Sequence, residues 1–323
     1  MKYSSGTFIR TFAPASVSNL NCGFDILGFA LEKPGDVVDL QLNDSREVSL
    51  KEITGDNGLL PTSVEKNTAS AVVKLYLEQT GINQGVAVSV HKQMPLNSGL
   101  GSSAASSVAA LLGINTLMGN QLSLSELLPL AMEGERLACG NAHADNVAPA
   151  LFGGLVLIRN NQPADIVSIP IPDSLWVAII HPDVSIPTRE ARKVLPEMIP
   201  LRDAVVQWGN VAGLIAGFYR NDPGLISRSL HDVVVEQHRS ARIPFFGEMR
   251  QVAIQAQALG FGISGSGPTV FAFCTSHAIA TAVTTRVSAL LSQGNVSHQT
   301  YVSMINPRGA EVLEIRQPEH LIH

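Results

Sequence analysis

Cysteine is scarce in this sequence. The 323 residues include three cysteines, Cys22, Cys139 and Cys274, which lie far apart along the chain. A disulfide framework needs an even and patterned set of cysteines, so this chain is not held together by disulfides. Such low cysteine usage predicts reduced thiols and a cytoplasmic location.

Long apolar runs and an excess of positive charge are also missing. No stretch approaches the ~20 apolar residues that cross a bilayer, and MKYSSGTFIRTFAPAS at the start lacks a signal-peptide core. The 22 Lys and Arg residues are outnumbered by 27 Asp and Glu residues, and no basic cluster occurs. We therefore expect neither a membrane nor a nucleic-acid partner.

Glycine, in contrast, is abundant and clustered. The 27 glycines include Gly99 with Gly101, Gly153 with Gly154, and the run GFGISGSG over residues 260–267. Clustered glycine marks tight turns or a close approach of the backbone to other groups. Three such places fit an enzyme built around a small anionic ligand, although ordinary turns explain the pair at 153 and 154 at least as well.

The first half of the chain mixes strand and helix patterns. Residues 36–43 and 85–92 alternate as half-buried strands do. The stretch NTASAVVKLYLEQTG over residues 67–81 predicts a helix with an asparagine cap and a glycine stop. Further helices are expected from about 103 to 118 and from Ser123, whose spacing to Glu126 matches a capping box.

The second half predicts a second unit. The segment NQPADIVSIPIPDS over residues 161–174 is rich in proline and polar residues, so we place a domain boundary there, near residues 160–173, between 1–165 and 166–323. Beyond it the patterns predict a strand, helices, a turn followed by a strand, another helix and a closing strand at 296–304. Because strands and helices interleave irregularly, the predicted class is α+β.

In the stretch PLNSGLGSSAASSVAALLG over residues 95–113, residues 98–107 carry no side chain larger than that of serine apart from Leu100. One explanation is a tight loop whose small residues let a helix pack closely on a sheet. A dinucleotide fingerprint is a second, because residues 99–104 fit G-x-G-x-x-A. Its context fails, since the preceding strand ends near Lys92 and a second helix follows the first. A Walker A loop fails too, because no Gly-Lys-Ser/Thr follows.

The third explanation is a cradle for an anion. Glycines without Cβ let backbone N–H groups approach phosphate oxygens, and the free N–H groups at a helix start add partial positive charge. The hydroxyls of Ser102 and Ser103 can bind phosphate or magnesium. Such a motif could hold a nucleoside triphosphate.

With these residues in view, the sequence resembles the GHMP superfamily of small-molecule kinases. Three separated motifs carry the resemblance, and two more narrow it to the homoserine branch. They are APASVSNLNCGFDILGFAL (13–31), PLNSGLGSSAASS (95–107), GFGISGSGPTVFAF (260–273), NAHADNVAPALFGG (141–154) and TREARKVLP (188–196). Position 21 departs from the pattern, because Asn21 stands where we expect glycine.

The resemblance implies a fold and an activity. It implies an N-terminal domain like domain 2 of ribosomal protein S5 and a ferredoxin-like C-terminal domain. It also implies ATP-dependent phosphorylation of L-homoserine to O-phospho-L-homoserine for threonine biosynthesis, with Mg²⁺ as cofactor and a homodimeric assembly.

The resemblance also implies roles for individual residues. Ser103 and Glu135 would bind magnesium, and Asn146, Thr188 and Arg192 would act in catalysis. The homoserine pocket would comprise Asn19, Asp25, His143, Asn146, Arg192 and Arg239. The phosphate loop would comprise Pro95, Leu96, Asn97, Ser98, Gly99, Leu100, Gly101, Ser102, Ser103, Ala104 and Ala105.

The chemistry of these residues suits the reaction. Homoserine is a zwitterion, so Asp25 suits its ammonium, while Arg192 and Arg239 can bind its carboxylate bidentately. Arg189 and Arg242 are neighbouring arginines for which a plain surface role is the alternative. Phosphoryl transfer needs mainly alignment and charge neutralisation, and one carboxylate such as Glu135 suffices for magnesium.

Asp145 stands where some relatives in the superfamily place a catalytic aspartate. The resemblance implies that the homoserine branch works without a dedicated base, the phosphate itself taking the proton. We therefore predict a structural or electrostatic role for Asp145. Two rival functions remain: another small-molecule kinase of the mevalonate type, and an inactive nucleotide-binding regulator.

Overall fold

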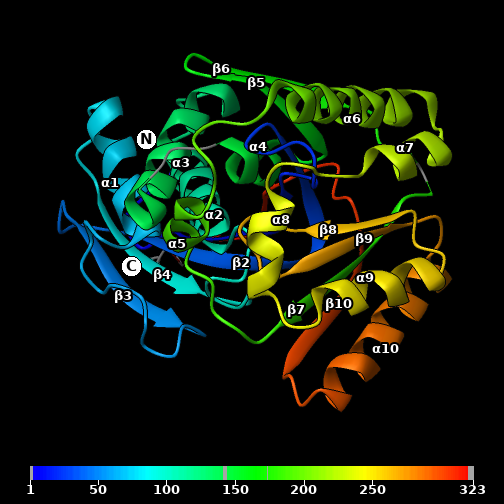
Figure 1. The fold of residues 1–323 in the computed structure, drawn as a ribbon. Coiled ribbons are helices and arrows are strands. Elements are labelled where there is room, and N and C mark those ends of the chain that lie inside the picture. The colour runs from blue at the N-terminus through cyan, green and yellow to red at the C-terminus, as the bar shows by residue number, and fades with distance from the viewer. Residues whose placement is uncertain (1–2, 141–143, 173, 319–323) are drawn as a thin grey trace.

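Two β-sheets organise the chain (Figure 1). A computed structural model of the protein describes residues 3–140, 144–172 and 174–318. The larger sheet contains seven strands: five lie in the order β11-β1-β2-β4-β3, and the β5–β6 hairpin pairs with the start of β2. Its strands are β1 (Phe8–Ser18), β2 (Leu27–Asn43), β3 (Val48–Thr54), β4 (Gly85–His91), β5 (Leu155–Asn161), β6 (Ala164–Ile169) and β11 (Glu311–Arg316). The β3–β4 pair is parallel, and the other pairs are antiparallel.

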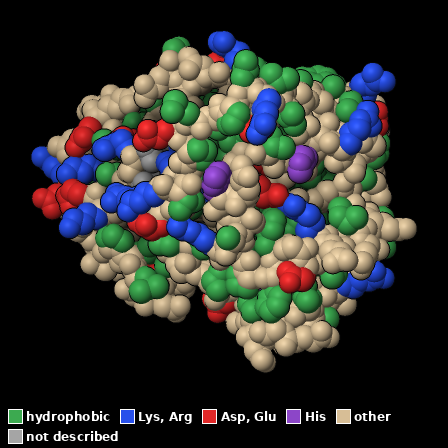
Figure 2. Space-filling model, in the orientation of Figure 1, with side chains coloured by type: hydrophobic (Ala, Val, Ile, Leu, Met, Phe, Trp, Pro, Cys, Tyr) green, Lys and Arg blue, Asp and Glu red, His purple; other side chains and the backbone are tan. Residues whose placement is uncertain are grey.

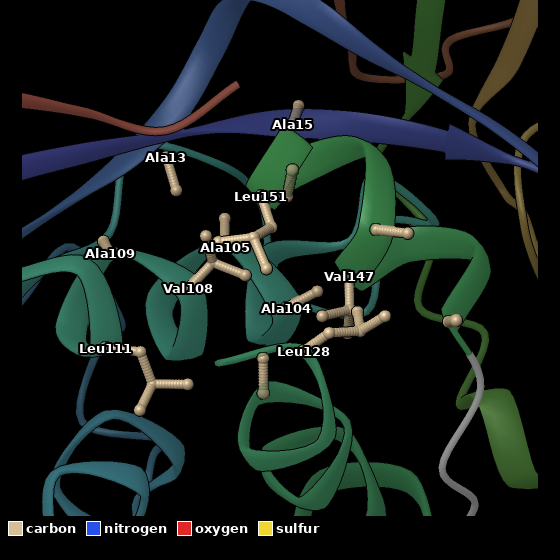
Figure 3. Packing of buried hydrophobic residues seen from close by; sticks show 14 of the residues in the cluster. Ala13, Ala15, Ala104, Ala105, Val108, Ala109, Leu111, Leu128, Val147 and Leu151 are labelled. Atoms are coloured by element: carbon tan, nitrogen blue, oxygen red, sulfur yellow. The ribbon is translucent and has the colours of Figure 1, made fainter. Parts of the chain in front are cut away.

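Four helices pack together over one face of this sheet. They are α1 (Thr68–Thr80), α2 (Ser102–Leu117), α3 (Leu124–Cys139) and α4 (Ala144–Phe152). Figure 3 shows how closely α2 packs: Ala104, Ala105 and Ala109 lie in one cluster with Ala13 and Ala15 of β1 and with side chains of α3 and α4. Because α2 is buried almost all round, it carries no charge and few bulky residues.

The second sheet is antiparallel, with strand order β10-β7-β9-β8. Its strands are β7 (Trp176–Pro182), β8 (Gly260–Ile263), β9 (Val270–Cys274) and β10 (His298–Met304). Helices α9 (Phe246–Gln255) and α10 (His277–Gln293) cover one face and form a second core with it. The other face joins the first core, where Phe271 and Phe273 lie 6.0 and 5.4 Å from the ring of Phe29 in β2.

Four helices lie between β7 and β8 in the sequence, both of which are strands of the second sheet. They are α5 (Thr188–Lys193), α6 (Leu201–Arg220), α7 (Pro223–Ser229) and α8 (Glu236–Arg239), the last followed by a 3₁₀ turn at Ser240–Arg242. Among the described residues, no helix is both long and apolar enough to cross a membrane.

Most predicted elements form, and their caps are those the sequence predicts. The side chain of Asn67 accepts N–H groups of the first turn of α1, and Gly81 ends that helix in a left-handed conformation with φ of 66°. Ser123 and Glu126 form the expected capping box at the start of α3. The mixture of two sheets and packed helices agrees with the predicted α+β class.

Three predictions about strands were wrong. The proline-rich segment chosen for the domain boundary contains β6, which pairs with β5 as a hairpin. Gly260–Ile263 forms strand β8 rather than a turn, because its glycines leave room for the side chains of Leu230 and Asn21. The strand β10 does not close the chain, since β11 follows and returns to pair with β1 in the first sheet.

Candidate active site

The three separated motifs meet at one place in the fold. The backbone N–H of Ser16, in the first motif, donates to the carbonyl of Leu100 in the second at 3.0 Å. The hydroxyl of Ser264, in the third motif, donates to the carbonyl of Gly99 at 2.6 Å. Residues as far apart in the sequence as Ser16 and Ser264 are thereby fixed around one loop.

A cavity of about 630 Å³ opens where these motifs meet. Most of the residues that the sequence assigns to the site line it: Asn19, Asp25, Leu96–Gly99, Gly101–Ser103, Glu135, Asn146, Thr188, Arg192 and Arg239. Within the phosphate loop, Leu100, Ala104 and Ala105 instead point into the core and are fully buried. Figure 2 shows charged side chains of both signs gathered on this face of the molecule around α1, α3 and α5.

The glycines of the loop are required by the protein itself. Gly99 and Gly101 have φ of 81° and 66°, where only glycine is unstrained. A Cβ at Gly99 would lie 2.4 Å from the carbonyl oxygen of Ser264, and one at Gly101 would lie 2.2 Å from the hydroxyl of Ser16. The close-packing explanation therefore holds for these two positions, and it is compatible with an anion cradle on the open side of the loop.

The start of α2 supplies the donors for such a cradle. The N–H of Ala105 donates to the carbonyl of Gly101, which closes the first helical turn. The amides of residues 102–104 precede that bond, so they have no acceptor within the helix. Because Ser102 and Ser103 line the cavity, this end of α2 faces it and offers its partial positive charge to an anion.

The hydroxyl of Ser102 is committed elsewhere, to a buried ion pair that the sequence prediction missed. Ser102 and Ser106 donate to Asp36 at 2.9 and 3.1 Å, and the ammonium of Lys92 binds the same carboxylate. The ammonium also donates to the carbonyl of Ser102 at 2.9 Å. Through these hydrogen bonds the Asp36–Lys92 ion pair fixes the position of the first turn of α2.

Only strand register could have revealed this pair in the sequence. Asp36 is the first residue of one predicted strand and Lys92 the last residue of the other, and the register places Val37 opposite His91. The two charges therefore sit side by side on antiparallel strands, one position beyond that pair. A buried charge needs a partner, so each explains the presence of the other.

Ser103 and Glu135, the predicted magnesium ligands, are brought together. The Ser103 hydroxyl donates to the Glu135 carboxylate across α2 and α3. Burial raises the pKa of Glu135, against the opposing effects of the Ser103 hydrogen bond and the charge of Lys92. A hydroxyl and a carboxylate beside a helix start are hard oxygen donors, so they fit Mg²⁺ shared with phosphate oxygens. No group of three acidic, cysteine or histidine side chains able to hold a metal forms among the described residues.

Asp25 and Arg192 form a bidentate ion pair at the other side of the cavity. The guanidinium nitrogens lie 2.8 and 3.0 Å from the carboxylate oxygens, and both side chains are partly exposed. The side chain of Asn19 accepts the N–H of Asp25 at 3.0 Å and donates to the carbonyl of Gly265. Asn19 thus holds the turn that presents Asp25.

Arg239 lies deeper beside this pair. Its guanidinium donates to the carbonyl of Gly265 at 2.7 Å, while its Nε has no partner among the described residues. Burial, and then the charge of Arg192, lower the pKa of Arg239 to about 10. Both arginines lie over the ring of Phe24, at 5.2 and 5.1 Å from its centroid. Two cations held together in this way favour an anionic ligand.

Asp145 and Asn146 begin α4 and line the cavity between the two ends. Asp145 is buried, and burial followed by the charges of Asp25 and Glu135 raises its pKa to about 7. The side-chain oxygen of Asn146 accepts the hydroxyl of Ser16 at 2.9 Å, which fixes the amide beside Gly101.

Thr188 is the first residue of α5, and its hydroxyl lies 3.4 Å from that of Ser266 in the third motif. Ser266 was not singled out from the sequence, although it belongs to a motif that was. The prediction for His143 falls outside the described residues.

The departure at position 21 has a structural explanation. Asn19, Leu20 and Asn21 are consecutive residues with positive φ, of 73°, 42° and 61°. Asparagine tolerates this left-handed conformation better than most residues, so it can replace glycine there. The Asn21 amide also donates to the carbonyl of Leu230 at 3.3 Å.

Comparison with known proteins gives the class of the molecule. The GHMP kinases N-terminal domain family matches residues 67–154, and the GHMP kinases C-terminal family matches residues 214–293. Structures of mevalonate kinases share the fold, among them that of L. major with a TM-score of 0.71 at 14% identity.

More similar relatives are homoserine kinases. That of Chlorobium phaeobacteroides is 47% identical over 94% of this chain and 99% of its own length. The crystal structure of homoserine kinase from Cytophaga hutchinsonii has a TM-score of 0.94 and 49% identity, covering 97% of this chain and 99% of that one. The chain therefore belongs to the GHMP kinase family, in its homoserine kinase branch, as the motifs predicted.

Proposed function

We propose that this protein transfers the γ-phosphate of ATP to the side-chain hydroxyl of L-homoserine, giving O-phospho-L-homoserine for threonine biosynthesis. One observation carries the proposal: a single cavity has a helix start facing it from one side and a carboxylate beside two arginines on the other. The first suits a triphosphate, and the second suits an amino acid.

The Asp25–Arg192 pair would accept the two charges of homoserine. The substrate ammonium would bind Asp25, and its carboxylate would bind Arg192 and Arg239. When homoserine binds, its ammonium would replace Arg192 as the partner of Asp25, and its carboxylate would replace Asp25 as the partner of Arg192. Every charge in the pocket would then keep a counter-ion. Mevalonate has no ammonium, so it would separate the pair and leave Asp25 without compensation.

The phosphates would lie along the amides of the 95–105 loop and the first turn of α2. Ser103 and Glu135 would hold Mg²⁺ there, which neutralises charge on the phosphates when bound. The adenine ring of ATP would lie toward the start of α1, where Pro61, Asn67 and Val90 line the cavity beside Leu96.

In the transfer step, the homoserine hydroxyl oxygen forms a bond to the γ-phosphorus while the bond to the β–γ bridging oxygen breaks. ADP leaves, and the hydroxyl proton passes to an oxygen of the transferred phosphate. Thr188 and Asn146 would align the acceptor and the phosphate, since both line the cavity, Asn146 beside Gly101 and Thr188 on the same helix as Arg192. Asp145 would act through its charge rather than as a base.

An assay of ADP release with homoserine, mevalonate and a panel of sugars tests this proposal. We expect turnover with L-homoserine well above every other acceptor. Turnover on mevalonate alone would contradict the assignment, and the absence of turnover on any acceptor would favour an inactive nucleotide-binding protein. The homodimer, the cytoplasmic location and the domain boundary at residue 165 remain predictions.

A further inference from the structure

We propose that Lys92 is a positioning residue for the phosphates of the nucleotide. Its ammonium cancels the charge of Asp36 beside the first turn of α2, so that the amides of that turn stay available to an anion. The proposal rests on the phosphate site proposed above, and it gives a role to a buried ion pair that the transfer step does not use.

The ion pair lies directly beside the phosphate loop. Asp36 belongs to β2, Lys92 follows β4, and Ser102 and Ser106 belong to α2, which packs over β2 (Figure 1). The side chains of Lys92 and Asp36 are 2% and 0% exposed. Lys92, Ser102 and Ser106 nevertheless line the cavity. The carboxylate of Asp36 is therefore buried in contact with three residues that form part of the cavity wall.

The hydrogen bonds of the pair are complete. The ammonium binds Asp36 and donates to the carbonyl of Ser102 and the hydroxyl of Ser106 at 2.9 and 2.8 Å, which uses all of its N–H donors. Oδ2 of Asp36 accepts the ammonium and both serine hydroxyls, while Oδ1 accepts the N–H of Gln93 at 3.0 Å. Because neither side chain needs a ligand for its own hydrogen bonds, their effect on a ligand is indirect.

The stability of the fold does not explain why this pair is charged. Replacing a buried ion pair by apolar side chains of similar volume is often neutral or stabilising. Removing one partner alone is strongly destabilising, because it leaves a buried charge without compensation. A reason for the charges must therefore come from their location, which is the start of α2.

The amides at the start of α2 are not capped by a side chain. Gly101 precedes the helix and makes no side-chain cap, and the first turn contains no acidic residue. Asp36 touches this turn, but it accepts the serine hydroxyls rather than the backbone amides. The partial positive charge of the helix start is therefore left for a ligand.

An uncompensated carboxylate at this position would oppose that ligand. It would attract the partial charge of the helix start and repel the phosphates. The ammonium of Lys92 prevents this, because it neutralises Asp36 and also bonds to the first turn. Glu135 is a second carboxylate bonded to the turn, through Ser103, and the predicted Mg²⁺ would be its counter-ion. Each carboxylate beside the phosphates thus has a cation of its own.

Nucleotide binding to Lys92→Met gives the first test. Methionine roughly keeps the length of the side chain but leaves the charge of Asp36 uncompensated. We expect the affinity for a non-hydrolysable ATP analogue, measured by titration calorimetry, to fall at least about tenfold. KM for homoserine should change little. Lys74→Met removes the same charge from an exposed ion pair with Glu65, so it should bind the analogue like the unmodified protein.

Asp36→Asn separates a charge effect from a purely structural one. The amide keeps an oxygen that can accept the serine hydroxyls but has no charge. Combined with Lys92→Met, it should restore most of the lost affinity, because no uncompensated charge remains. As a single variant it leaves a positive charge beside the phosphates, so it should bind the analogue at least as tightly as the unmodified protein. If the pair only held the loop in place, both Asp36→Asn proteins would bind the analogue weakly.

Thermal unfolding shows which variants are folded. If Lys92→Met does not fold, the single Asp36→Asn variant and the double variant still provide the test, because neither contains a buried carboxylate without a partner. An unmodified protein that fails to bind the analogue would contradict the proposed function itself. If the unmodified protein binds it, three results would overturn the present inference alone: unchanged affinity in Lys92→Met, no recovery in the double variant, or weakened binding in Asp36→Asn.

Discussion

Asp25 and Arg192 stand 167 residues apart in the sequence and meet as a bidentate pair in the cavity. Both residues were predicted from the resemblance to the family, and their charges suit a zwitterionic substrate, which needs one partner of each sign. Their mutual contact could not, because nothing local to either residue indicates the other. The same holds for Lys92 and Asp36, whose pairing depends on how two strands align.

Asp25→Asn tests the role of the carboxylate in binding the substrate ammonium. The change removes a charged hydrogen-bond acceptor, which is worth about 1.5–3 kcal/mol. We expect KM for homoserine to rise roughly 10- to 100-fold while KM for ATP changes little. Glu190→Gln, an exposed residue on the same helix as Arg192, serves as control and should leave both values unchanged. An equal rise in KM for ATP would contradict the assignment.

Glu135→Gln tests the predicted magnesium ligand. The amide keeps the shape of the side chain and can still bond to Ser103, but it loses the negative charge. We expect the Mg²⁺ concentration needed for half-maximal activity to rise at least about tenfold. Glu133→Gln alters a partly exposed residue of the same helix that pairs with Arg136, so its Mg²⁺ requirement should stay that of the unmodified protein. If both variants behave alike, Glu135 holds no metal.

Asp145→Asn distinguishes a charge effect from proton abstraction. A general base is typically worth about 10²–10⁴-fold in turnover. Because we assign Asp145 an electrostatic role, we expect kcat to fall by less than that range. A fall of about a thousandfold with unchanged substrate binding would show that it acts as a base.

The same variant has a predicted effect on stability. The pKa of Asp145 is about 7 in the folded chain, raised from its ordinary 3.8 chiefly by burial. Between these values the folded chain binds a proton that the unfolded chain has lost, so this residue makes the free energy of unfolding fall as pH rises. Without ligands, Asp145→Asn should therefore be more stable than the unmodified protein at pH 8, by roughly 2–4 kcal/mol.

Urea unfolding at pH 4 and pH 8 measures this difference. The stability advantage of Asp145→Asn should be nearly absent at pH 4, where both carboxyl and amide are uncharged. Asp165→Asn, which changes a partly exposed carboxylate on β6, should show no comparable trend. An advantage independent of pH would mean that packing, rather than ionisation, is responsible.

Helices with local cap signals were easier to predict than strands whose formation depends on other segments of the chain. Caps such as Asn67 and the Ser123–Glu126 box are local signals, and both form as expected. The hairpin strand β6 was missed because proline and polar residues around it outweighed a short alternating pattern. Strand β8 was missed because its glycines, which favour turns, are there to admit side chains from other segments.

The phosphate loop gives a prediction at the level of the element. Gly101→Ala would place a Cβ 2.2 Å from the hydroxyl of Ser16 and would also strain a φ of 66°. Gly119→Ala, at the other end of α2, meets a similar φ of 84° but no close atom, so it isolates the cost of the backbone conformation. That cost is about 1 kcal/mol.

We expect Gly119→Ala to lower stability by about this amount and to retain full activity. Gly101→Ala should lose more stability and most of its ATP affinity, because the loop must move away from Ser16. Thermal unfolding and ATP titration by calorimetry provide the two readouts. Equal behaviour of the two variants would mean that the close contact at Gly101 has no functional role.

For the molecule as a whole, the α+β class and the kinase family were both predictable from the sequence and are confirmed. What escaped prediction is long-range: β11 returns to pair with β1, so the end of the chain completes the first sheet. The cavity likewise depends on contacts between distant segments, such as Asn19 and Gly265, which are 246 residues apart. Sequence patterns report local conformation and chemistry, whereas these contacts are set by the packing of the complete fold.

A crystal structure with a non-hydrolysable ATP analogue, Mg²⁺ and L-homoserine tests the central claim most directly. We predict phosphate oxygens within hydrogen-bonding distance of the amides at the start of α2, with the amino-acid charges of homoserine on Asp25 and on Arg192 and Arg239. A triphosphate bound away from the 95–105 loop, or homoserine bound outside this cavity, would contradict the account.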